Sequence, residues 1–136
     1  MALTAKKIFV NLAVEDLEKT IAFYQGIGFE FNAQFTDSKA ACLVISDDIY
    51  VMLLVKDFFK TFTGKELADP ATSTEAILAI SAESRAQVDE IADKALAAGG
   101  KYSNDPTDHG FMYVRSFQDV DGHLWEVMYT DMEAAQ

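Results

Sequence analysis

The hydrophobic residues in the first half of the chain follow the pattern of a strand, then of a helix, then of strands again. An apolar run at residues 8–14 predicts a buried strand, and Leu17, Thr20, Ile21 and Tyr24 then recur on one face of a helix through residue 25. Asp16 is suited to cap this helix, because its carboxylate can accept the free amides of the first turn. Three β-rich segments follow, at residues 29–36, 40–45 and 49–55, separated by turn-forming Asp and Ser. This half is expected to fold as β-α-β-β-β.

The second half shows the same order of patterns after an aromatic connector. Residues 57–70 predict a short helix followed by a linker. A strand is then expected at 77–82 and a helix from Glu83-Ser84 to Gly99-Gly100. Three more β segments are expected, at residues 101–103, 111–117 and 124–130, with residues 119–122 as the last turn.

Direct comparison of the halves supports an internal repeat. Residues 12–16 align with 80–84, so that strand end falls on strand end and helix cap on helix cap. Residues 47–52 align with 121–126 at a slightly larger offset, which the longer second helix explains. We therefore predict an α+β fold of paired β-α-β-β-β modules forming a partly closed, cup-shaped mixed sheet with helices outside. Module one would span about 6–56, the connector 57–74 and module two 75–131 of a single domain.

Composition narrows the function classes. The 136 residues are half hydrophobic, enough for a sizeable core, and carry a formal net charge of −11. This charge repels phosphate backbones and anionic lipid, so neither nucleic acid nor a membrane is expected as a partner. Residues 1–7 contain no apolar export segment, and a cytoplasmic location is expected. The lone Cys42 lies in an apolar run and is predicted to be a core residue.

Two motifs resemble those of the vicinal oxygen chelate superfamily, which includes glyoxalases, bleomycin-resistance proteins and extradiol dioxygenases. They are FVNLAVEDL at 9–17, leading to AFY at 22–24, and DVDGHLWEV at 119–127. HGFMY at 109–113 and RSFQD at 115–119 are similar to uncharacterised members described as predicted lactoylglutathione lyases. The resemblance covers nearly the whole chain and implies a small-molecule ligand in the cup and a homodimer.

In metal-dependent members of that superfamily, the ligands come from four pseudo-equivalent positions on the first and last strands of the modules. Carried over to this chain, they are Phe9, Met52, Ile77 and Glu126. Phenyl and alkyl groups have no lone pair to donate, and a thioether favours soft metals. Catalytic zinc usually needs about three protein ligands, so no tightly bound divalent metal is expected and Glu126 alone is retained.

Other polar residues are candidates for contact with a ligand. Glu126 is expected in the cup, because burying an unpaired carboxylate is costly. Asn11 shares a strand face with Phe9, and His109 lies in a loop, where binding residues concentrate. The other histidine, His123, should point to the face opposite Glu126, so the two are not expected to chelate one ion.

Tyr113 and Arg115 share one face of the penultimate expected strand. Together they would suit a carboxylate or oxyanion, since a guanidinium offers a planar fork of donors. The favoured alternative is an internal salt bridge from Arg115 to Glu126 on the adjacent strand. An apolar cup is also suggested by the aromatic residues Phe31, Phe35, Phe58, Phe59, Phe62, Phe111 and Tyr129.

Three functions stay open at this point. The first is a binding module that holds a small organic molecule without metal, as bleomycin-resistance members do. The second is a lactoylglutathione-lyase-like lyase or isomerase with a rearranged metal set, such as Glu126 with His109. The third is a metal-free enzyme that uses Glu126 as a general base. The first is preferred, because three ligand positions are lost while the cup motifs remain.

Overall fold

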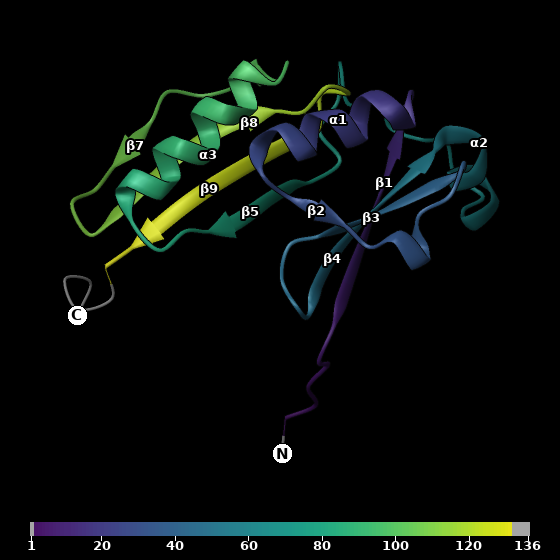
Figure 1. Ribbon diagram of the computed structural model, residues 1–136, viewed down its shortest axis with the longest axis horizontal. Coiled ribbons are helices and arrows are strands. Elements are labelled where there is room, and N and C mark those ends of the chain that lie inside the picture. The colour runs from purple at the N-terminus through teal and green to yellow at the C-terminus, as the bar shows by residue number, and fades with distance from the viewer. Residues whose placement is uncertain (1, 132–136) are drawn as a thin grey trace. The chain divides into compact units, whose positions relative to one another are not determined.

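The computed structural model describes residues 2–131 (Figure 1). The chain divides into two compact units, Met1–Leu67 and Ala68–Gln136. Each unit contains one mixed sheet with a helix on one of its faces. None of the helices in the described part of the chain has the length and apolar character needed to cross a membrane.

The first unit is built on a four-stranded sheet in the order β1-β4-β3-β2. Its elements in chain order are β1 (Ile8–Val14), α1 (Leu17–Ile27), β2 (Glu30–Phe31), the 3-10 turn η1 (Ala33–Phe35), β3 (Ala40–Val44), β4 (Ile49–Val55), α2 (Lys56–Phe59) and the 3-10 turn η2 (Lys60–Phe62). Strands β1 and β4 are parallel, and the other pairs are antiparallel. This arrangement leaves β1 at one edge of the sheet and beside the last long strand of the unit.

Helix α1 covers one face of this sheet. It begins after Asp16, whose carboxylate accepts a hydrogen bond from the Lys19 amide at 3.2 Å. It ends at Gly28, whose φ of 123° favours glycine. Leu12, Val51 and Leu53 are buried on the face that packs against the helix. Because side chains alternate along a strand, the residues between them lie on the opposite, open face.

The second unit repeats this topology. Its elements are β5 (Ile77–Ser81), α3 (Arg85–Ala97), β6 (Lys101–Tyr102), β7 (Thr107–Asp108), β8 (Met112–Gln118) and β9 (Leu124–Thr130). The sheet order is β5-β9-β8-β6, with β5 and β9 parallel and the short β7 paired to β8. Trp125, Val127 and Phe117 are buried on the side of the sheet that contacts α3. The repeated strand order confirms the two-module α+β prediction.

The structure differs from the sequence-based elements in the short segments. The strand expected at 29–36 is limited to Glu30–Phe31, because Asn32 caps η1 by accepting the Gln34 amide at 2.9 Å. Strand β7 was not expected, since two polar residues carry no periodicity. Cys42 is 2% exposed, which confirms its core position, and burial raises the pKa of its thiol.

Candidate functional site

The open face of the first sheet carries three of the residues singled out from the sequence. Asn11 lies opposite Met52 in the β1–β4 register, and Phe9 lies opposite Tyr50. The rings of Phe9 and Tyr50 stack with centroids 5.1 Å apart. Phe9 and Met52 therefore lie on the face away from α1.

A pocket of about 370 Å³ opens on this same face. It is lined by Asn11 from β1, Leu54 from β4, Phe59 and Phe62 from the helical segment after β4, and Thr63. The volume falls within the range of small-molecule sites, and the walls are mostly apolar, as such sites usually are. The sheet contributes the floor, and the chain leaving β4 contributes the aromatic wall.

Two polar groups are available inside this apolar lining. Asn11 donates one Nδ2 hydrogen to the Phe9 carbonyl at 3.2 Å, which leaves its second Nδ2 hydrogen as a donor and its Oδ1 as an acceptor. Thr63 accepts the Lys65 amide at its Oγ1 at 3.1 Å, so its hydroxyl hydrogen remains to donate. The pocket thus offers both hydrogen-bond donors and an acceptor, and no charged side chain lines it among the described residues.

The equivalent positions in the second unit are also on an open face. Ile77 lies opposite Leu124, and Glu126 lies opposite Ala79 and Ser116. Trp125 and Val127, the neighbours of Glu126 in sequence, are buried on the α3 side. Glu126 is therefore half-buried and points away from α3.

The residues at the four family positions do not fit a divalent metal. Only Glu126 supplies an oxygen donor, while Phe9 and Ile77 supply no lone pair. Across residues 2–131 there is also no group of three or more His, Cys, Asp or Glu side chains placed to hold an ion. These four positions therefore lack the donors that metal-assisted chemistry requires.

Arg115 and Tyr113 point to the other face of the second sheet. Arg115 lies opposite Val127 in the β8–β9 register, and its guanidinium bonds Asp93 at 2.8 Å and Asp89 at 3.1 Å. Tyr113 donates its hydroxyl to Asp89 at 2.6 Å. The expected Arg115–Glu126 salt bridge is therefore wrong, because residues one step out of register lie on opposite faces.

This network anchors α3 to its sheet. The hydrogen bond from Tyr113 is the main cause that lowers the pKa of Asp89, and Arg115 adds to it. The Arg115 side chain is 18% exposed and satisfied by two carboxylates. Tyr113 and Arg115 are thus engaged with helix α3 in this structure, whereas the sequence left open ligand contact or a salt bridge to Glu126.

His109 lies in the turn between β7 and β8 and is exposed. Its backbone amide bonds the Met112 carbonyl, and its ring stacks on Phe111 with centroids 6.5 Å apart. Glu126 pairs with Ser116, four residues further along β8 than Met112, which corresponds to about 13 Å of strand. The two residues proposed for a rearranged metal set are thus not brought together.

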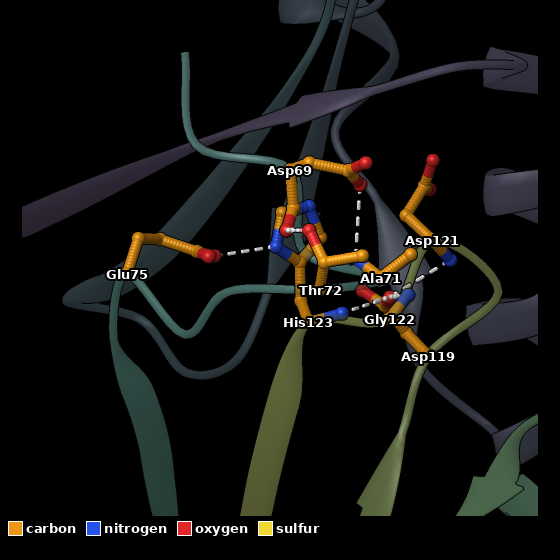
Figure 2. Close-up of polar contacts among 8 residues, drawn as sticks. All are labelled: Asp69, Ala71, Thr72, Glu75, Asp119, Asp121, Gly122 and His123. Carbon is orange, nitrogen blue, oxygen red and sulfur yellow. Dashed lines mark hydrogen bonds and ion pairs between the residues drawn. The ribbon is translucent and has the colours of Figure 1, made fainter.

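The second histidine belongs to a polar cluster around the β8–β9 turn (Figure 2). Asp119 accepts hydrogen bonds from the amides of Asp121, Gly122 and His123 at 2.9–3.0 Å. The buried His123 bonds Glu75 through Nδ1 at 2.6 Å. A turn at residues 69–72 packs on Gly122, where an added Cβ would lie 2.8 Å from the Pro70 carbonyl oxygen. The cluster fastens the segment before β5 to the turn before β9.

Part of the pocket lining can be predicted from the sequence. Asn11 was a candidate residue, and Phe59 and Phe62 were among the aromatic residues expected to suit a cup. Leu54 and Thr63 were missed. Leu54 could have been predicted from strand alternation, because it lies two residues after Met52 and so shares a face with it. Thr63 follows a 3-10 turn, and no periodicity indicates its position.

A family model decides the relationship of this chain to known proteins. The model of the Glyoxalase/Bleomycin resistance protein/Dioxygenase superfamily matches residues 8–127. The chain belongs to this superfamily. The match spans both β-α-β-β-β units, so it covers the pocket in the first unit and Glu126 in the second.

Several solved structures share this fold. A hypothetical protein, SA1046, from S. aureus is 26% identical, with a TM-score of 0.78 over 93% of this chain and 94% of that one. The fosfomycin resistance protein FosX from Listeria monocytogenes is 24% identical, with a TM-score of 0.70 over 98% and 100% of the two chains. A superfamily enzyme from Burkholderia phytofirmans PsJN is 16% identical, with a TM-score of 0.74 over 90% and 96%. Comparison with curated proteins gives no match.

Proposed function

We propose that this protein binds a small organic molecule in the pocket on the open face of its first sheet, without the metal site of metal-dependent relatives. The observation that carries the proposal is the pocket itself. It has a leucine and two phenylalanines as apolar walls, and an asparagine and a threonine as polar groups. Small-molecule sites typically combine such walls with a few oriented polar groups.

The position of the pocket supports this proposal. Asn11 lies two residues from Phe9 and opposite Met52, the two family positions of the first unit. The ligand would therefore contact the face from which metal-dependent relatives supply ligands. Two structural neighbours are fosfomycin resistance proteins, which supports a small organic molecule as the kind of ligand that this fold accommodates.

The donor chemistry supports binding without metal. Phe9 and Ile77 place hydrocarbon at positions where metal-dependent relatives have metal donors. A lactoylglutathione-lyase-like reaction through Glu126 and His109 has less support, because the turn that carries His109 lies about 13 Å along β8 from the residue paired with Glu126.

Fluorescence titration with N-phenyl-1-naphthylamine, a neutral apolar probe, tests the proposal. Phe62→Ala removes one aromatic wall, and Phe35→Ala is its matched control. The two phenylalanines are 67% and 62% exposed, but only Phe62 lines the pocket. We expect saturable binding by the native protein, about fivefold weaker binding by Phe62→Ala and unchanged binding by Phe35→Ala. No saturable binding, or equal losses in both variants, would overturn the proposal.

A further inference from the structure

The pocket in the first unit is uncharged, and this restricts the class of molecule that it can hold. Its lining consists of one amide, one hydroxyl and three hydrocarbon side chains. A charged group taken from water into such a lining would lose part of its hydration and gain no counter-charge. A carboxylate, phosphonate or ammonium ligand is therefore disfavoured at this site.

Two lysines of the first unit have partners outside the pocket. Lys56 bonds Glu15 at 2.6 Å, and both line a neighbouring groove together with Asp57 and Lys60. The ammonium of Lys39 lies 5.8 Å from the centre of the Phe58 ring. Neither Lys39 nor Lys56 lines the pocket, so neither supplies a counter-charge there.

The charge of the chain is unevenly distributed between the units. Residues 1–67 contain seven lysines against nine aspartates and glutamates, which leaves a formal charge of −2. The remainder of the −11 therefore belongs to residues 68–136. The pocket lies in the nearly balanced unit, so a strong attraction for cations has no source within this unit.

The two polar groups of the pocket define a hydrogen-bonding pattern. Asn11 offers its Oδ1 as an acceptor and its second Nδ2 hydrogen as a donor, because only one Nδ2 hydrogen is given to the Phe9 carbonyl. Thr63 offers its hydroxyl hydrogen as a donor, because its oxygen already accepts the Lys65 amide. A neutral hydroxyl or carboxamide both donates and accepts, and so it can satisfy the two residues together.

We propose that the ligand of this pocket is an uncharged, ring-containing alcohol, phenol or carboxamide, held by Phe59 and Phe62 and oriented by Asn11 and Thr63. This inference rests on the proposed function. It adds the charge and the hydrogen-bonding group of the ligand, which the family relationship leaves open. Asn11 selects the polar group, and the aromatic wall supplies most of the affinity.

Competition with the fluorescent probe tests the charge. Four naphthalenes with different substituents are used at neutral pH: 1-naphthalenemethanol, 1-methylnaphthalene, 1-naphthoate and 1-naphthylmethylammonium. They share one ring system and differ in charge and hydrogen bonding. We expect the alcohol to displace the probe at least tenfold more tightly than the anion or the cation. Equal or tighter displacement by either charged compound would overturn the inference.

The role of Asn11 is tested with two leucine variants. Asn11→Leu is expected to abolish the severalfold preference for the alcohol over 1-methylnaphthalene while keeping affinity for 1-methylnaphthalene, which also shows that the pocket has formed. Asn104→Leu, at an exposed asparagine in the other unit, should keep the preference. An unchanged preference in Asn11→Leu would contradict the role of the amide.

The outcomes separate this inference from the proposed function. Binding of the probe with no preference for the neutral alcohol overturns the inference alone. Failure of the probe and of all four naphthalenes to bind overturns the proposed function and the inference together.

Discussion

Asn11 lies directly opposite Met52 across β1 and β4, and Ala79 lies opposite Glu126 in the same way across β5 and β9. Phe9 precedes Asn11 by two residues, as Ile77 precedes Ala79. The two units thus present the four family positions in the same register. Three of these positions carry side chains that are not metal donors for a divalent ion, although the strands pair in the register that the repeat predicts.

We expect the purified protein to contain no stoichiometric zinc, nickel or manganese. A single carboxylate cannot replace the roughly three protein ligands that a catalytic metal site usually needs. Elemental analysis of protein prepared without a chelator or a histidine tag measures this. One equivalent of metal that disappears in Glu126→Gln would contradict the account, as would metal-restored turnover of the methylglyoxal–glutathione adduct.

The position of Arg115 makes a prediction about stability. Arg115→Met should lower the free energy of unfolding by about 1–2 kcal/mol, because Asp89 and Asp93 lose their partner. This value lies between those typical of exposed and of buried ion pairs. Glu126→Gln should change it by less than about 0.5 kcal/mol, since Glu126 does not pair with Arg115. Urea unfolding of both variants provides the measurement. Comparable losses of unfolding free energy in the two variants would favour a salt bridge between Arg115 and Glu126.

Asp108 is expected to titrate with a pKa of about 2. The hydrogen bond from Arg85 is the main cause of this lowering from 3.8, and the Gly110 amide adds to it. Since the pKa is lower in the folded state, the stabilisation is present above pH 3.8 and is lost as the pH falls toward 2. Carboxyl-carbon NMR should show the pKa moving most of the way back to 3.8 in Arg85→Gln. An Asp108 pKa near 3.8 in the native protein would refute the pairing.

Gly122→Ala should destabilise the second unit by about 2–3 kcal/mol, because φ is +103° and the new Cβ would lie 2.8 Å from the Pro70 carbonyl oxygen. Gly28→Ala is the matched control. It also has a positive φ, but nothing lies within 4 Å of its Cβ, so a loss of about 1 kcal/mol is expected. Thermal or urea unfolding compares the two, and equal losses would argue against close packing of the 69–72 turn on Gly122.

The repeated elements could be predicted from sequence because their signals are local. Strands Ile8–Val14, Ile49–Val55 and Leu124–Thr130 have the predicted bounds, and Asp16 and Ser84 cap the two long helices. Each depends on apolar periodicity and a capping side chain, which neighbouring residues determine. The expected homodimer and cytoplasmic location stay predictions.

The candidate site was less predictable because it depends on pairing between strands. Alternation correctly placed Tyr113 and Arg115 on one face, but it does not say which residue of β9 lies opposite Arg115. In the observed register Val127 lies opposite Arg115. Glu126 is one residue away and therefore lies on the other face, so Arg115 pairs with Asp93 of α3. The pocket likewise depends on the path of the chain after β4, which brings Phe59, Phe62 and Thr63 over Asn11.

Backbone amide chemical-shift mapping with N-phenyl-1-naphthylamine locates the bound molecule. We expect saturable shifts centred on residues 9–13, 52–55 and 58–64, with little change in the turn that carries His109. Shifts centred on His109 and Glu126, or no saturable shifts at all, would contradict a binding site in the pocket beside Asn11.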